Sequence, residues 1–206
     1  IAAFKRSYQF EHVFKSAFCI GLLPMLYAPA LPLVLIVPVT LVLYRRTLRE
    51  AVVAAAGLLL PFFICSVVWW GLGDSFGLMG HELLAGTTLG EDTALPALFG
   101  EKGVWRKVYI GLFAALTLCS AIIILRTLPS LRTRAKKIHI HFLWLLLLCL
   151  ISLLLPGSTI ASLGVLAVPC CVTVSAFFIR YRGWLPLAIY TVLTALMLYI
   201  NLFPGV

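Results

Sequence analysis

The sequence predicts an all-α fold: a polytopic bundle of transmembrane helices that forms one integral membrane domain over residues 1–206. Hydrophobic residues make up 63% of the chain and charged residues only 11%, whereas a soluble domain is about half apolar and about a quarter charged. The apolar residues also stand in long uncharged blocks, as they do where a bilayer is the solvent. Backbone groups in lipid must be bonded within their own segment, so these blocks predict helices. The absence of period-two alternation argues against strands.

The first apolar block, Ala17–Tyr44, is too long for an ordinary single span and carries four prolines, Pro24, Pro29, Pro32 and Pro38. Proline disfavours helix in the residue before it, so Tyr27–Pro32 is the expected break. We therefore predict a hairpin of two short helices, Ala17–Tyr27 and Leu31–Tyr44. Each would reach about 20 Å, short of the roughly 30 Å hydrocarbon core. The hairpin is then partly re-entrant, or its first helix extends back through Gln9–Ser16.

Five further blocks predict single spans, with a turn at Pro156-Gly157 and a kink at Pro169: Ala51–Trp70, Val108–Leu125, Ile140–Leu155, Ser158–Ile179 and Trp184–Phe203. With the hairpin they give about seven membrane segments. A glycine-rich loop, residues 71–104, follows the first of these spans, and we expect short interfacial helices in it near Leu83–Ala85 and Ala94–Phe99. Small residues four apart, Ala51 with Ala55 and Ser158 with Ser162, would let neighbouring helices approach closely.

The positive charges lie at the ends of apolar blocks, so the formal charge of +9 indicates membrane topology and not a nucleic-acid partner. If the turn after the hairpin is cytoplasmic, every Lys and Arg except Lys102, Arg106 and Lys107 also becomes cytoplasmic, and most acids fall outside. This asymmetry predicts a multi-pass protein of a bacterial inner membrane with loop 71–104 in the periplasm. The predicted topology and lipid anchors are Arg45, Arg46, Arg49, Arg132, Arg134, Lys136, Lys137, Arg180 and Arg182.

The chain starts with Ile1 instead of Met, and Ile1–Phe4 resembles the tail of an earlier apolar segment, so we expect further sequence to precede it. The six cysteines all fall inside apolar blocks and are interpreted as small hydrophobic residues, the adjacent Cys170 and Cys171 included. The expected partners are membrane lipids and other membrane subunits.

Loop 71–104 holds the only cluster of ionisable groups away from a basic rim, and Asp74, His81 and Glu82 are the candidate catalytic residues within it. Acids at such a site would handle a hydroxyl, a sugar or a metal on the outer face of the membrane. The favoured interpretation is nevertheless a solvated loop, because loops are polar by default.

No metal site or cofactor is expected. His81-Glu82 lacks the spacing of a zinc motif, and no cysteine is near it. His139 and His141 stand two residues apart, so they face different sides of a helix and do not share one metal. We expect these two histidines among lipid headgroups beside Lys136 and Lys137.

The stretch Phe18–Leu31 has a Tyr-x-Pro turn and is followed by Tyr44–Glu50 and Ala56–Pro61. This pattern resembles an uncharacterised family of polytopic inner-membrane proteins from Bacteroidota, known as a domain of unknown function. The resemblance covers most of the chain, including Arg180–Trp184, and family members are longer at the N-terminus. The same hairpin, basic turn and Gly-x-x-x-Pro helix are also similar to part of the membrane domain of GT-C type glycosyltransferases, which use polyprenyl-phosphate donors. Those enzymes usually carry a catalytic Asp in a first outer loop near the N-terminus, a region outside this sequence, so no catalytic residue is carried over.

Three functions are compatible with this sequence. The leading hypothesis is a non-catalytic membrane subunit in envelope biogenesis or transport that works through partners or lipid; it predicts an apolar contact face of small residues. A membrane transferase with a lipid-linked substrate predicts a groove beside loop 71–104, with Asp74, His81 and Glu82 as polar contributors. A small-molecule permease predicts a polar midplane cavity near Pro24–Pro38, since broken helices expose backbone to a substrate.

Overall fold

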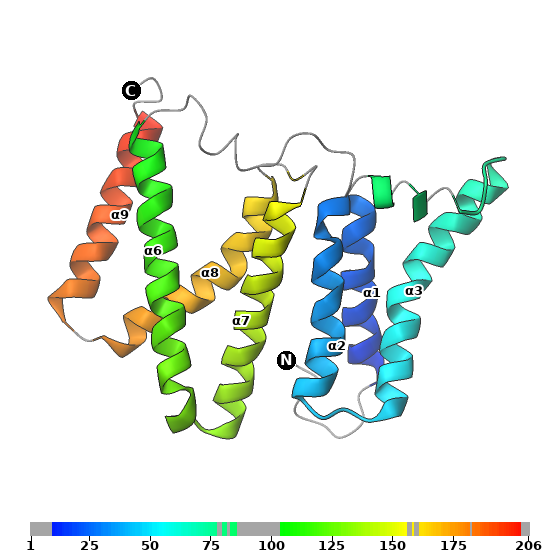
Figure 1. Cartoon of the computed structure of the whole chain (residues 1–206), viewed down its shortest axis with the longest axis horizontal. Helices are drawn as coiled ribbons and strands as arrows, with labels where there is room; N and C mark the ends of the chain where they lie inside the picture. The colour runs from blue at the N-terminus through cyan, green and yellow to red at the C-terminus, as the bar shows by residue number, and fades with distance from the viewer. Residues whose placement is uncertain are drawn as a thin grey trace.

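The computed structural model describes residues 10–77, 80–81, 83–85, 104–155, 158, 161–181 and 183–202. Within these ranges the protein is helical and contains no strand, which confirms the all-α prediction. The elements, shown in Figure 1, are α1 (Phe10–Leu26), the 3-10 helix η2 (Ala28–Leu35), α2 (Ile36–Leu43), α3 (Leu48–Gly71), α6 (Val104–Thr127), η3 (Leu128–Ser130), α7 (Thr133–Leu154), α8 (Ala161–Arg180) and α9 (Trp184–Leu202).

Four helices in the described part of the chain, α3, α6, α7 and α8, are long and apolar enough to cross a membrane. Two shorter apolar segments, Ala28–Leu43 and Pro186–Ile200, accompany them. The fold is therefore that of a helical protein suited to a membrane, and the count of seven membrane segments stays a prediction. Helix α7 begins at Thr133, seven residues before the predicted start at Ile140. It takes in the basic residues there because Lys and Arg are good helix formers whose long stems reach toward polar surroundings.

The hairpin forms, with its break at Tyr27. The first helix extends back to Phe10, as the second of the two predicted alternatives had it. Tyr27 is in an extended conformation (φ −152°, ψ 97°), and the chain then winds as a 3-10 helix before it becomes α-helical at Ile36. The prediction of an α-helix from Leu31 was therefore wrong. With three residues per turn, a 3-10 helix places Pro29 and Pro32 on one face, and both are buried.

A hydrogen bond from α7 completes this 3-10 segment. Pro32 has no N–H with which to bond the Pro29 carbonyl three residues earlier. The buried Ser152 Oγ of α7 donates to that carbonyl oxygen at 2.6 Å. The proline-rich arm is thus tied to α7 by a polar contact that its own backbone cannot supply.

Helices α1 and α3 cross closely because glycine lies at each contact. A Cβ on Gly21 would stand 2.6 Å from the Leu58 carbonyl oxygen, and one on Gly57 would stand 2.9 Å from the Phe14 carbonyl oxygen. Small residues four apart were predicted to lie on helix contact faces. Ser158 and Ser162 are both buried, as that prediction requires, but Ala55 is exposed. The α3 contact face instead runs through the buried residues Ala54, Gly57 and Pro61. Two residues four apart lie on the same face of a helix, but their spacing does not tell which face packs against a neighbouring helix.

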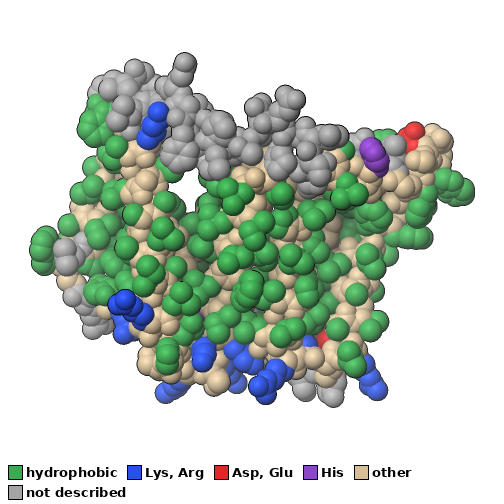
Figure 2. Space-filling model, viewed as in Figure 1, with side chains coloured by type: hydrophobic (Ala, Val, Ile, Leu, Met, Phe, Trp, Pro, Cys, Tyr) green, Lys and Arg blue, Asp and Glu red, His purple; other side chains and the backbone are tan. Residues whose placement is uncertain are grey.

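The core lies where α1, η2, α2, α3 and α7 meet, and α8 crosses obliquely between α7 and α6, while α9 packs against α6 (Figure 1). Lys and Arg side chains gather at the end where α2 turns into α3 and α6 turns into α7 (Figure 2). The C-terminal end of α3, which leads into Asp74, lies at the opposite end. The charge pattern predicts that the basic residues and Asp74 lie at opposite ends of the helices, as they do here. Which end faces the cytoplasm stays a prediction. The turn at Pro156-Gly157 and the segment Ala94–Phe99 lie outside the described residues, whereas Leu83–Ala85 is helical.

Candidate functional site

The candidate residues of loop 71–104 are only partly described. Asp74 follows the C-terminal end of α3, where its backbone N–H donates to the Trp69 carbonyl, and His81 lies in a short helical stretch; both side chains are exposed. Glu82 lies outside the described side chains, as do Glu91 and Asp92. No group of three His, Cys, Asp or Glu residues that could hold a metal ion occurs among the residues that the structure describes. The described part of this loop therefore brings no set of catalytic groups together.

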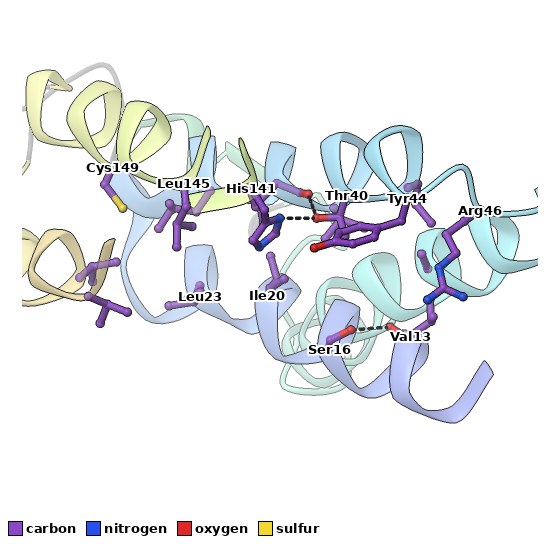
Figure 3. Close-up of a pocket in the computed structure, with 17 residues that line it drawn as sticks. Val13, Ser16, Ile20, Leu23, Thr40, Tyr44, Arg46, His141, Leu145 and Cys149 are labelled. Atoms are coloured by element: carbon purple, nitrogen blue, oxygen red, sulfur yellow. Dashed lines mark hydrogen bonds between the residues drawn. The ribbon is translucent and has the colours of Figure 1, made fainter. Parts of the chain in front are cut away.

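A cavity of about 400 Å³ lies instead between α1, the η2–α2 arm, α7 and α8 (Figure 3). Its volume is within the range typical of small-molecule sites. Most of its wall is apolar, and Leu23, Leu145 and Cys149 lie at one end of it (Figure 3). The polar side chains, listed from α1 to α7, are Ser16, Thr40, Tyr44, Arg46 and His141. The cavity lining therefore has a polar part and an apolar part.

Thr40 and His141 join α2 to α7 in the polar part. The Thr40 Oγ1 hydroxyl donates to the Ile36 carbonyl at 2.5 Å, and the same oxygen lies 3.2 Å from Nδ1 of His141. A hydroxyl has one proton to donate, so we assign the proton of the second bond to Nδ1, which donates to Thr40. The imidazole ring is held by this bond and projects toward Ile20 and the cavity (Figure 3).

His139 and His141 are both half-buried, and their expected place among lipid headgroups beside Lys136 and Lys137 stays a prediction. His141 is half-buried, lines the cavity, and has its ring centroid 6.4 Å from that of Tyr44. Because α7 begins at Thr133, His141 already lies about 12 Å along the helix, on the face that is turned to α2. The sequence showed the distance between the two histidines but not which one faces a neighbouring helix.

Arg46 is held at the cavity by a buried carboxylate. Its guanidinium lies 3.1 Å from Glu50 Oε1, and Glu50 is only 1% exposed. Glu50 also closes a capping box at the start of α3: its backbone N–H donates to Thr47 Oγ1, and its Oε2 accepts from the Thr47 N–H. The sequence analysis treated Arg46 as a topology anchor only and did not single out Glu50. The Thr-x-x-Glu spacing ahead of an apolar run was the signal that could have found it.

The turn between α2 and α3 places Tyr44 and Arg46 together. The Arg45 N–H bonds to the Val42 carbonyl and the Arg46 N–H to the Leu41 carbonyl, which is the hydrogen-bond pattern of a Schellman motif. Arg45 has the positive φ of 50° that this motif requires, and it is exposed. Burial raises the pKa of the Tyr44 phenol, which therefore keeps its proton at neutral pH.

The predicted anchors differ in their exposure. Lys137 and Arg46 are half-buried, and the Lys137 ammonium lies 5.7 Å from the centroid of the Tyr44 ring. The exposed anchors, as predicted for topology, are Arg45, Arg49, Arg132, Arg134, Lys136 and Arg180, while Arg182 lies outside the described residues. Of these two, Arg46 lines the cavity, whereas Lys137 lies beside Tyr44, which lines it.

The cavity is open to the surface of the bundle. Val168 of α8 lines it and is 58% exposed, and Ser16 of α1 lines it and is also exposed. On a helix suited to a membrane, the exposed aliphatic surface of α8 is the surface that lipid would cover.

No protein family, curated protein or solved structure matches this chain. What the fold and cavity define is a class: a helical protein suited to a membrane, with an amphipathic cavity among its helices. The similarities to the Bacteroidota family and to GT-C glycosyltransferases stay predictions.

Proposed function

We propose that this protein is a non-catalytic integral membrane component of bacterial envelope biogenesis or transport, and that it holds a membrane amphiphile in the cavity. The observation that carries the proposal is the distribution of polarity in one continuous cavity: Thr40, Tyr44 and His141 at one end and an aliphatic wall at the other. Ligand sites of this kind are largely apolar, with a few polar groups that fix orientation. A lipid has the same division between head and chain.

The hydrogen bonds favour binding over nucleophilic catalysis. A hydroxyl nucleophile needs a neighbouring base that accepts its proton. Here the Thr40 hydroxyl donates to the Ile36 carbonyl of its own helix, so its proton is not directed at Nδ1 of His141, which lies 3.2 Å from the same oxygen. The Ser16 hydroxyl likewise donates to the Val13 carbonyl at 3.0 Å. These groups are arranged to hold the helices and to line the cavity.

The test is a pair of tryptophan variants on α1. Ile20→Trp fills the cavity, which Ile20 lines. Leu26→Trp adds the same side chain at a position that is 84% exposed, so it serves as the matched control. After gentle detergent extraction, native mass spectrometry should show bound lipid reduced several-fold in Ile20→Trp and unchanged in Leu26→Trp. Equal lipid occupancy in both variants would disprove the proposal.

A permease is the second candidate, and the position of the cavity along the proline-broken arm favours it. A permease predicts a polar midplane cavity, whereas in this cavity Thr40 and Tyr44 lie toward Arg46, away from Leu23 and Cys149 (Figure 3). Ile20 lines the cavity and is half-buried, so a cysteine in its place offers a direct comparison. With the six native cysteines replaced by alanine, a membrane-impermeant maleimide should modify the Ile20→Cys variant from both sides of the membrane in a permease. A lipid-filled cavity predicts slow modification from either side.

A further inference from the structure

We infer that the bound amphiphile is an anionic phospholipid, with its phosphate beside Lys137 and Arg46 and one acyl chain along the aliphatic wall toward Cys149. This inference rests on the proposed function and specifies its ligand. It is carried by three groups that meet at the polar end: Tyr44 at the C-terminal end of α2 and Arg46 in the following turn both line the cavity, and Lys137 of α7 lies over the Tyr44 ring.

The charge at this end is positive after its internal pairing is counted. Glu50 neutralises Arg46 at 3.1 Å, which leaves the Lys137 ammonium over the Tyr44 ring as the second half-buried cation. Further basic residues neighbour these two in the chain: Arg45 and Arg49 lie close to Arg46, and Arg134 and Lys136 precede Lys137. A cationic headgroup would be repelled there, whereas a phosphate finds donors on two sides.

The exposure of each basic residue indicates whether it could bind a phosphate at a defined site or only contribute to the positive potential of the surface. Exposed cations attract anionic lipid through a field that salt screens within about 10 Å. Lys137 is half-buried and fixed against an aromatic ring, whereas its neighbour Lys136 is exposed. The two lysines are adjacent in the chain, and Lys137 alone lies beside Tyr44 of the cavity lining. Comparing them therefore distinguishes a phosphate held at the polar end of the cavity from one attracted to the surface.

The aliphatic part fits a chain that is only partly enclosed. From His141 to Cys149 the α7 wall runs eight residues, or about 12 Å. Val168 of α8 also lines the cavity and is 58% exposed, so a longer chain would leave the cavity past this residue and enter the surrounding hydrocarbon. A free phosphate ion would make no use of this wall.

The experiment measures lipid preference with the full chain in neutral detergent. Phosphatidylglycerol and phosphatidylcholine with identical acyl chains compete for the protein, and native mass spectrometry counts each bound species. We expect about a tenfold preference for phosphatidylglycerol. Lys137→Gln should reduce that preference at least threefold, whereas the matched control Lys136→Gln should leave it unchanged, and Lys137→Arg should retain it. Thermal melting of each variant confirms that it is folded.

Each alternative outcome has a definite meaning. If Ile20→Trp abolishes binding but the two lipids bind equally, the anionic ligand is wrong and the proposed function stands. If Lys136→Gln and Lys137→Gln lower the preference equally, the attraction is a surface field and the inference is wrong. If millimolar inorganic phosphate displaces phosphatidylglycerol completely, the ligand is the free ion. If Ile20→Trp leaves the binding of both lipids intact, the proposed function itself fails.

Discussion

The two ends of the chain show two ways of building a membrane helix. Helices α1 and α3 cross at glycines so closely that an added Cβ would strike backbone, and the cavity lies beside them. Helix α9 packs against α6 and leaves large apolar side chains exposed, among them Trp184, Leu187, Tyr190 and Leu202. In lipid an exposed apolar side chain costs nothing, so hydrophobicity alone does not drive helices together. Small residues and hydrogen bonds are needed where the structure must hold a site.

Helix α9 contacts α6 and α8 through pairs of aromatic rings. The rings of Trp105 and Tyr199 meet edge to face at 5.7 Å, and those of Phe178 and Tyr190 at 6.4 Å. Such pairs contribute about 0.5–1.5 kcal/mol each. They join α9 to α6 and α8 without the close backbone approach found between α1 and α3. We therefore expect the two regions to respond differently to the same substitution.

The largest difference should come from leucine truncation. Leu148→Ala removes a side chain that is 3% exposed in the α7 core and leaves a cavity, which should cost about 2–5 kcal/mol. Leu187→Ala, on α9 at 65% exposure, should change stability by less than about 0.5 kcal/mol. Thermal or denaturant unfolding in detergent measures both. Equal losses would show that α9 is packed in the native protein as tightly as the core.

Alanine at the helix crossing should have a somewhat smaller effect. Gly21→Ala places a methyl group 2.6 Å from the Leu58 carbonyl, so the helices must separate at a cost of about 1–3 kcal/mol. Gly111→Ala on α6 meets nothing within 4 Å and should be neutral or slightly stabilising, because alanine favours helix. The same unfolding measurement compares them. A neutral Gly21→Ala would contradict the close crossing.

The smallest effect should be the loss of one hydrogen bond. Ser152→Ala leaves the Pro29 carbonyl without its donor from α7, which should cost about 1 kcal/mol. Ser175→Ala is the control, since that exposed hydroxyl bonds only to the Val172 carbonyl of its own helix. Unfolding should show a loss for the first variant alone. If both variants unfold alike, the α7 contact does not hold the proline-rich arm.

The sequence was sufficient for most of the fold because length and apolarity decide where membrane-suited helices form. The hairpin break at Tyr27 followed from proline chemistry alone. The cavity could not be predicted, since it depends on which face of α7 meets α2. That contact makes His141 a lining residue and decides that Lys137 is half-buried while Lys136 is not. Ala55 failed as a contact residue for the same reason.

The 3-10 winding of η2 changes how far this arm of the hairpin reaches. A 3-10 helix rises about 2.0 Å per residue and an α-helix about 1.5 Å. The 8 residues of η2 and the 8 of α2 therefore extend about 28 Å, where a continuous α-helix of the same residues would extend about 24 Å. A hydrocarbon core is about 30 Å thick. By loosening its pitch where prolines already prevent α-helical bonding, a segment with too few residues comes close to the full thickness of a bilayer.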